Sequence, residues 1–308
     1  MEGIFLMIDA DLTRQWHIGI DLGGTKIEGI VLDGGYRECM RLKLETRASE
    51  GYGRVLERIV HIYHTLSSAL DNGAHTLGVC TPGSISVKTG LLKNCNATQL
   101  NGHPLQADLR ERLGRPFALE NDANCFAIAE ARNGAGVGFG TVLGLVLGTG
   151  VGAGVVFDGR LLAGRHGIAG EWGHMAINPD GPSCYCGRKG CVERYLSGSA
   201  LEASYLELSG QMIELSDIVG QARAGEKHSS VLLDKFLSDF ASAVANVVAV
   251  LDPGVIVIGG GLASIDELYT VGVERLSRTV FNDSFETPVR RNALGNSAGV
   301  IGAAMIGI

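Results

Sequence analysis

A histidine and three cysteines fall close together in the middle of this 308-residue chain. The run GEWGH at 170–174 is followed by cysteines at 184, 186 and 191. One imidazole and three thiolates form a closed tetrahedral zinc set, which leaves no open position for a substrate. Proline and glycine mark the segment as an exposed loop, and this disfavours three buried thiols with a core histidine. We predict a structural zinc ion in loop 174–191, bound by His174, Cys184, Cys186 and Cys191.

Two carboxylates flank this predicted metal loop. Glu171 precedes the histidine by three positions, and Glu193 follows the last cysteine by two. Carboxylates held by a rigid loop suit bidentate capture of the vicinal hydroxyls of a sugar. If one ring nitrogen of His174 binds zinc, the other can donate to a sugar oxygen.

A second polar cluster, ENDAN at 120–124, lies where a predicted strand ends and a helix begins. Asp122 has two interpretations at such a place: a helix N-cap, or a base that takes a hydroxyl proton. Asn121 and Asn124 supply donors and acceptors that suit sugar hydroxyls. Phosphoryl transfer needs little covalent help beyond alignment, charge neutralisation and such a base. We therefore favour Asp122 as a general base.

Two glycine-rich turns follow apolar strands. In the first, DLGGTK at 21–26, backbone N–H groups and a hydroxyl can face a phosphate, and the aspartate can hold Mg²⁺ through water. Lys26 either neutralises phosphate charge or is a solvated strand residue. The first turn lacks the spacing of a P-loop, and the second, GTGVGA at 148–153, continues as a strand where a dinucleotide-binding turn would open a helix. The predicted nucleotide contacts in these turns are Asp21, Gly23, Gly24, Thr25, Lys26, Gly148, Thr149 and Gly150.

A third glycine run, at 259–261, follows a buried strand. It offers a flat backbone surface for a nucleotide, and a crowded packing corner is an equal alternative. Gly260 and Gly261 are the predicted nucleotide contacts under the first interpretation.

The first two glycine-rich turns lie in an internal repeat of the sequence. Residues 19–35 and 144–160 align without gaps, with seven of seventeen positions identical. Each copy reads as an apolar strand, a Gly/Thr turn and a second strand that ends in Asp-Gly. Duplication explains the match better than chance, and it predicts two similar domains that present their turns to one ligand.

The remaining elements alternate between strands and helices. Apolar runs predict further strands at 75–80, 117–119 and 255–258. Amphipathic or apolar patterns predict helices at 52–69, about 105–113, 124–133, 236–251 and 298–308, the last packed on the opening domain. The alternation indicates an α/β class with two sheets.

Composition and charge exclude several classes of function. The net charge is −7 without a basic stripe, so no nucleic-acid partner is expected. No apolar stretch is long enough to span a bilayer, and residues 1–16 read as a frayed extension without a signal peptide's basic region. The scattered cysteines Cys39, Cys80, Cys95 and Cys125 read as buried thiols of a reducing compartment. We expect a cytoplasmic protein with no membrane partner.

Taken together, these motifs resemble the ROK family of bacterial sugar kinases and repressors from about residue 18 onward. They are DLGGTK at 21–26, PGSIS at 82–86, ENDAN at 120–124, LGTGVGAG at 147–154, GEWGH at 170–174, CYCGRKGCVE at 184–193 and DPGVIVIGGG at 252–261. The resemblance implies an actin-like ATPase (ribonuclease H-like) fold, with two α/β domains and an active-site cleft between them. The domains would be 1–121 plus about 292–308, and 122–291 with the zinc loop. The implied sugar contacts are Gly83, Asn121, Asp122, Glu171, His174 and Glu193.

Within the family, the runs at 82–102 and 286–290 look most like manno(fructo)kinases. The resemblance implies ATP-dependent phosphorylation of a hexose at its 6-hydroxyl, with fructose as the first candidate. It also implies ATP, Mg²⁺ and structural Zn²⁺ as cofactors and a homodimeric assembly. N-acetylglucosamine kinase or glucokinase is the alternative. Repressors of this family carry a DNA-binding helix-turn-helix ahead of the first Gly-Gly turn. Only about twenty residues precede that turn here, so we do not expect a repressor. A non-catalytic sugar sensor is the alternative from another class.

Overall fold

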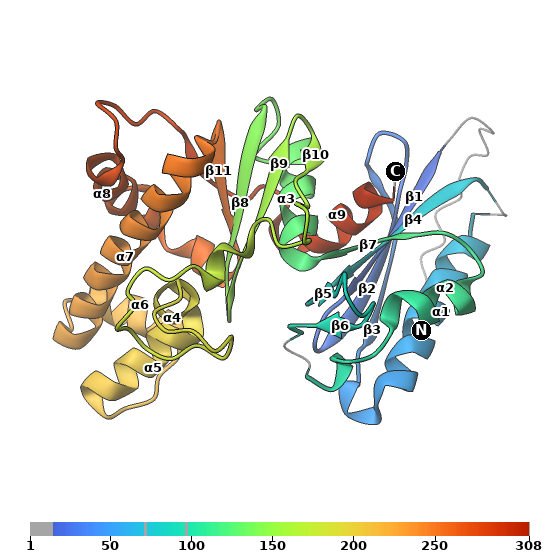
Figure 1. Cartoon of the computed structure of the whole chain (residues 1–308), viewed down its shortest axis with the longest axis horizontal. Helices are drawn as coiled ribbons and strands as arrows, with labels where there is room; N and C mark the ends of the chain where they lie inside the picture. Colours follow the sequence, from blue (N-terminus) through green and yellow to red (C-terminus); the bar gives the residue numbers. More distant parts are fainter. Residues whose placement is uncertain (1–14, 71–72, 96–97, 308) are drawn as a thin grey trace. The chain divides into compact units, whose positions relative to one another are not determined.

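Within residues 15–70, 73–95 and 98–307, which a computed structural model describes, the strands form two five-stranded sheets and one small hairpin (Figure 1). Two compact units contain these sheets. One unit extends to Glu120 and takes in residues from Ala303, and the other covers Asn121–Gly302. The domain limits predicted from the sequence, at 121 and about 292, stay a prediction. Most of the predicted N-terminal extension, up to residue 14, lies outside the described residues.

The first sheet has the order β3-β2-β1-β4-β7. Strands β1 and β2 form an antiparallel pair around the first glycine turn, and β4 lies parallel to β1. A two-stranded hairpin, β5-β6, follows β4 in the chain. The bounds are β1 Trp16–Leu22, β2 Lys26–Leu32, β3 Glu38–Glu45, β4 His75–Thr81, β5 Ser84–Ile85, β6 Leu92–Lys93 and β7 Ala118–Asn121.

Helices cover both faces of this sheet. Helix α1 (Tyr52–Ser68) buries Ile59, Ile62 and Leu66 at helical spacing, and the last two lie over Gly29 of β2. Helix α9 (Ala298–Ile306) lies on the opposite face, where the carbonyl of Ala303 approaches the α-carbon of Gly78. Helix α2 (Leu105–Leu113) contributes its leucines to the core that α1 forms with the sheet. The helices predicted at 52–69, 105–113 and 298–308 are thereby confirmed, within a few residues at their ends.

The second sheet repeats the arrangement of the first. Its order is β10-β9-β8-β11-β12, with β8 antiparallel to β9 and parallel to β11. The alignment that pairs Gly19 with Gly144 also pairs the first and last residues of β1 with those of β8, and those of β2 with those of β9. The bounds are β8 Thr141–Leu147, β9 Val151–Phe157, β10 Arg160–Leu161, β11 Val255–Gly259 and β12 Val289–Arg291. This shared topology supports the internal duplication.

The repeated glycines serve the same purpose in both sheets. A side chain at Gly29 would collide with α1, and one at Gly154 would collide with α3 (Asp122–Asn133). Both glycines therefore let a helix approach the middle of the sheet closely.

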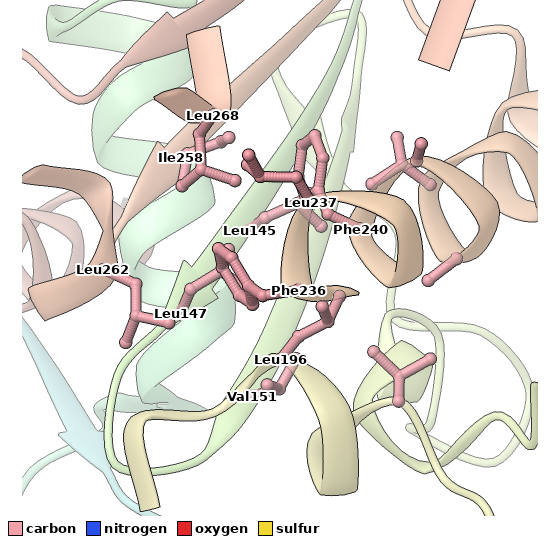
Figure 2. Close-up of a cluster of buried hydrophobic side chains, with 14 of the residues drawn as sticks. Leu145, Leu147, Val151, Leu196, Phe236, Leu237, Phe240, Ile258, Leu262 and Leu268 are labelled. Atoms are coloured by element: carbon pink, nitrogen blue, oxygen red, sulfur yellow. The ribbon is translucent and has the colours of Figure 1, made fainter. Parts of the chain in front are cut away.

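The opposite face of the second sheet carries the main core of that unit. Helix α7 (Lys227–Leu251) buries Phe236 and Phe240 there, in one cluster with Leu145 and Ile258 (Figure 2). Burying each phenylalanine contributes roughly 1.5–3 kcal/mol. The other helices of this unit are α4 Glu193–Leu196, α5 Gly198–Ser209, α6 Leu215–Arg223 and α8 Val271–Thr279.

Local signals set the ends of α7. The Glu226 carboxylate accepts from the N–H groups of His228 and Ser229 at the start, and Asp252 adopts a left-handed conformation just before Pro253 at the end. The sequence predicted only the part from residue 236, so the helix begins nine residues earlier than expected. Among the helices of the described residues, none is long and apolar enough to cross a membrane.

Candidate functional site

The beginning of strand β9 is the common support for most of the predicted site in the second unit. On one face, Gly152 and Gly154 lie against the first turn of α3. On the other face, Val151, Ala153 and Val155 pack in the core cluster that contains Trp172. The sheet thus holds the start of α3 and the segment around Trp172 on opposite sides of one strand.

Asn121, and not Asp122, caps helix α3. The Asn121 side chain accepts from the N–H of Asn124 at 2.7 Å, so the N-cap interpretation of Asp122 is wrong. Asp122 is the first helical residue, it is exposed, and its Oδ1 accepts from the N–H of Ala123 at 2.8 Å. This short bond orients the carboxylate at the positive end of the helix, where a negative charge is favoured.

The GEWGH segment forms a short 3₁₀ helix, η3 (Glu171–His174). Trp172 anchors it, because the indole is buried and its Nε1 donates to the carbonyl of Ala243 at 3.2 Å. Gly173 lets η3 approach the carbonyl of Val151 so closely that no Cβ would fit. Glu171 and His174 are half-buried on either side of this anchor.

The four predicted metal ligands converge on one point. The ligand atoms of His174, Cys184, Cys186 and Cys191 all lie within 4.8 Å of one another. Two pairs of these atoms, Cys186 Sγ with Cys191 Sγ and Cys184 Sγ with His174 Nδ1, lie 3.6 Å apart. Zn–S bonds of about 2.3 Å in a tetrahedron place sulfurs about 3.8 Å apart. The residues present therefore fit a zinc ion.

The thiols fit a metal in their chemistry as well. Burial, with hydrogen bonds from the neighbouring thiols, raises the pKa of Cys191 to about 12, and burial also raises that of Cys184. These two thiols keep their protons at neutral pH until a cation displaces them. At Cys186 burial works against ionisation, but hydrogen bonds from the backbone of Arg188 and from the neighbouring thiols lower the pKa overall.

The second ring nitrogen of His174 has a neighbour that sequence reasoning missed. The hydroxyl of Tyr185 lies 3.0 Å from His174 Nε2, with the two rings at 89°. The Tyr185 side chain is 67% exposed. Burial of its hydroxyl, followed by the charge of Glu193, raises its pKa to about 12, so it keeps its proton at neutral pH. Nothing in the sequence distinguished this tyrosine from an ordinary loop residue.

Glu193 contacts the second glycine turn directly. Its Oε2 accepts from the N–H of Val151 at 3.0 Å. A Cβ at Gly150 would lie 2.7 Å from the same oxygen, so only glycine leaves room for this carboxylate. The predicted sugar contact Glu193 and the predicted phosphate turn are therefore neighbours.

In the third glycine run, Gly260 and Gly261 have different surroundings. Gly260 has a positive φ of 82° and lies against the backbone of Leu147, so any side chain there would collide with strand β8. A Cβ at Gly261 would meet nothing within 4 Å. The packing interpretation therefore applies to Gly260, whereas Gly261 leaves open space.

The first unit holds the other predicted residues, those of the first glycine turn and Gly83. Burial raises the pKa of Asp21, although a hydrogen bond with Cys80 works in the opposite direction. The turn after it is closed by a bond from the N–H of Gly23 to the carbonyl of Lys26, at 2.9 Å, while Gly24 has open space around it. Gly83 precedes β5, and a Cβ there would lie 2.5 Å from the carbonyl of Lys93.

Lys26 has a partner that weakens its case as a phosphate ligand. Its ammonium lies 2.9 Å from Glu28, which is buried and also contacts Arg41 and Lys43. Burial opposes ionisation of Glu28, but the hydrogen bonds from Lys26 and Arg41 lower its pKa overall. Lys26 thus neutralises a buried carboxylate. This contact favours the interpretation of Lys26 as a strand residue over its interpretation as a phosphate ligand.

The second unit therefore places most of its predicted site residues near the start of β9. Asn121 and Asp122 begin the helix on one face, and the metal loop with Glu171 and His174 belongs to the segment on the other, while Glu193 contacts the turn 148–150. One exposed carboxylate, two half-buried ones, hydrogen-bond donors and a backbone turn can bind a polyhydroxylated molecule and a phosphate.

Comparison with known proteins identifies the family. The sequence profile of the ROK family matches residues 17–307. The N-acetyl-D-glucosamine kinase of Pasteurella multocida (strain Pm70) is 34% identical over 299 residues, which cover 94% of this chain and 98% of that protein. The enzyme of the same name from Vibrio cholerae (serotype O1, strain ATCC 39315) is 33% identical over 305 residues, covering 95% and 99%.

Solved structures of ROK family proteins are similar to this chain over most of its length. The ROK hexokinase from Thermus thermophilus is 34% identical with a TM-score of 0.86, covering 95% of this chain and 97% of that one. The ROK family glucokinase from Streptomyces griseus, in complex with glucose and AMPPNP, is 30% identical with a TM-score of 0.73, covering 95% and 99%. These neighbours confirm the predicted actin-like ATPase fold and the resemblance to ROK sugar kinases. The finer resemblance to manno(fructo)kinases is not confirmed, since the curated relatives named above are N-acetylglucosamine kinases. The chain belongs to the ROK family.

Proposed function

We propose that this protein is an ATP-dependent sugar kinase that transfers the γ-phosphoryl group to the 6-hydroxyl of a hexose. The observation that carries the proposal is the grouping of the exposed Asp122, the carboxylates Glu171 and Glu193, and the turn 148–150 around the start of β9. A kinase needs a base, contacts that hold the sugar and a backbone cradle for phosphate, and this group contains a candidate for each.

Asp122 is the proposed general base. It would accept the proton of the attacking hydroxyl as the oxygen bonds to phosphorus, while Asn121, Glu171, His174 and Glu193 hold the other hydroxyls. The bond between its Oδ1 and the Ala123 N–H restricts rotation of the carboxylate, which lowers the cost of aligning it.

The glycine turns are the proposed phosphate contacts. Asp21 is the proposed magnesium ligand, because a buried carboxylate with a raised pKa is stabilised as an anion by a nearby cation. Bound Mg²⁺ would neutralise charge on the β- and γ-phosphates. Gly261, with open space beside it, is a better nucleotide contact than Gly260.

We propose zinc as a structural ion in the 174–191 loop. The four ligand atoms lie within 4.8 Å of one another, and two pairs lie 3.6 Å apart, close to the separation of about 3.8 Å around tetrahedral zinc. With Nδ1 on the metal, the Nε2 proton of His174 would be donated to the Tyr185 hydroxyl at 3.0 Å or to a sugar oxygen.

The sugar itself has two candidates. N-acetylglucosamine is favoured by the relatives of that name at 32–34% identity. Fructose is favoured by the sequence run at 82–102, as described above. The proposed homodimer is a further expectation, which sedimentation analysis of the purified protein tests.

The test is a substrate panel with a coupled ADP-release assay. We expect wild-type turnover with at least one of N-acetylglucosamine, glucose, mannose and fructose. Asp122→Asn keeps the oxygen that accepts from Ala123 but loses the base, so kcat should fall by about 10²–10⁴. Activity of this variant within a few-fold of wild type would refute the assignment of Asp122. Sugar binding by calorimetry without turnover on any hexose would favour the non-catalytic sensor.

A further inference from the structure

The turn Gly148–Gly150 is held on one side by the segment that follows the metal loop. The N–H of Gly198 donates to the carbonyl of Gly148 at 2.8 Å, and the hydroxyl of Ser199 donates to the carbonyl of Thr149 at 2.8 Å. The third contact is the bond from the N–H of Val151 to Glu193. Consecutive peptide groups of the turn are thus bound by residues more than forty positions away.

These bonds fix the direction of two amides. A trans peptide group is planar, with its carbonyl and its N–H pointing in opposite directions. The carbonyl of Gly148 shares its peptide plane with the N–H of Thr149, and the carbonyl of Thr149 shares its plane with the N–H of Gly150. Because both carbonyls point toward the start of α5, both N–H groups point away from it. Adjacent N–H groups with a common direction are what a phosphate requires.

The segment that supplies the contacts is itself firmly anchored. Leu196, at the end of α4, is buried in the same cluster as Leu147 and Val151, the residues on either side of the turn (Figure 2). Ser197 caps α5 by accepting from the N–H of Ala200 at 3.1 Å. At the other end, the N–H of Val192 donates to Met175, which directly follows the metal ligand His174.

We propose that Glu193 and Ser199 are positioning residues that orient the turn Gly148–Gly150 for the phosphates of ATP. Glu193 then has two roles, since one carboxylate contacts the sugar and also fixes the turn. Through Cys191 and Val192, the order of the metal loop reaches the nucleotide as well as the sugar. This proposal rests on the proposed function, in which the turn contacts ATP.

Ser199→Ala is the primary test. It removes the hydroxyl that donates to Thr149 and its 3.1 Å contact with the hydroxyl of Ser197, but it leaves the cap bond between Ser197 and the N–H of Ala200 in place. Loss of one hydrogen bond that holds the Thr149 peptide should raise the KM for ATP by about 2- to 10-fold. The KM for the sugar should stay unchanged. Ser199→Thr retains the hydroxyl and should restore the KM for ATP.

Ser209→Ala is the matched control. Ser209 lies in the same helix, and its hydroxyl also donates to a carbonyl at 2.8 Å, but to Tyr205 within the helix. A merely structural effect would lower the melting temperature of both variants without changing the KM for ATP of either. Only the positioning role predicts a change confined to Ser199→Ala.

Two substitutions of Glu193 separate its roles. Glu193→Gln keeps an oxygen that can accept from Val151, so it should raise the KM for the sugar while leaving the KM for ATP near that of wild type. Glu193→Ala removes the acceptor and should raise both.

The outcomes distinguish this proposal from the proposed function. If the wild type phosphorylates a sugar and Ser199→Ala has an unchanged KM for ATP, the positioning role is wrong and the kinase stands. If no sugar is phosphorylated, the affinity for MgATP measured by calorimetry decides whether Ser199 orients the turn. Weaker binding by Ser199→Ala than by wild type and Ser209→Ala supports the positioning role without the kinase, and equal binding by all three overturns it.

Discussion

Gly154→Ala tests whether the fit between β9 and α3 controls the position of Asp122. Gly154 lies under the first turn of that helix. An added Cβ would lie 2.6 Å from the carbonyl oxygen of Ala123 and 2.7 Å from the Cβ of Ala127. Both atoms belong to the helix that begins with Asp122, so the methyl group can be accommodated only if the helix moves or the strand bends.

The magnitude follows from these distances. Non-bonded carbon atoms are most stable about 3.5–4.0 Å apart, so the start of α3 must shift by roughly 1 Å. Overpacking of this kind costs about 1–3 kcal/mol of unfolding free energy. Misplacement of a catalytic group by about 1 Å lowers the rate by about 10²-fold. We therefore expect kcat to fall much more than the lost stability alone would suggest, because the variant is still folded at 25 °C.

The assay combines denaturant unfolding with steady-state kinetics on the preferred sugar. Gly220→Ala is the control: Gly220 is an exposed residue of helix α6, and a Cβ there meets nothing within 4 Å. It should raise the unfolding free energy by about 0.5–1 kcal/mol and leave kcat unchanged. Wild-type kcat and wild-type stability in Gly154→Ala would refute the reasoning.

Three further predictions follow from other sites. Cys191→Ser should release zinc, measured by metal analysis, and lower sugar affinity together with melting temperature, since metal binding and loop folding are coupled; a full zinc complement would contradict it. Glu130→Ala should lower the free energy of unfolding, measured with denaturant, by about 3 kcal/mol or more. The buried carboxylate accepts from three backbone N–H groups, those of Ala135, Ala293 and Leu294. A loss within about 0.5 kcal/mol, the size of an ordinary surface effect, would refute this expectation. Backbone hydrogen bonds at the start of α7 lower the pKa of Glu226 to about 2. A depressed pKa stabilises the fold above the unfolded value of about 4.3, so the stability difference between wild type and Glu226→Gln should shrink as pH falls from about 4.3 to about 2; a constant difference would contradict it.

Regular patterns made much of the fold predictable. The ungapped internal repeat placed four strands, because strand, turn and strand leave a repeating signature of apolar residues and glycines. Helix α1 was predictable since its apolar residues recur at helical spacing. Helices α5 and α6 were missed, because each buries few residues and the exposed face of α5 includes Leu206 and Leu208.

Within the candidate site, the sequence revealed the metal ligands because they lie within eighteen positions of one another and share unusual chemistry. It could not reveal the contact between Glu193 and Val151 or that between Ser199 and Thr149, which join residues 42 and 50 positions apart. A serine such as Ser199, near the start of a helix, has no spacing to other residues that would mark it as a partner of a distant turn. Asn121 and Asp122 are both good caps, so only the backbone geometry decides which of them begins the helix.

The position of helix α9 in the chain has a consequence for biosynthesis. The face of β4 that carries Gly78 is covered by residues from Ala303 onward, which are translated after the whole of the second unit. Domains usually complete folding in the order in which they leave the ribosome. Here the second unit, an uninterrupted stretch from Asn121 to Gly302, can complete its sheet while the first still waits for its last helix. Throughout that interval the nascent first unit presents an uncovered face to chaperones and to other nascent chains.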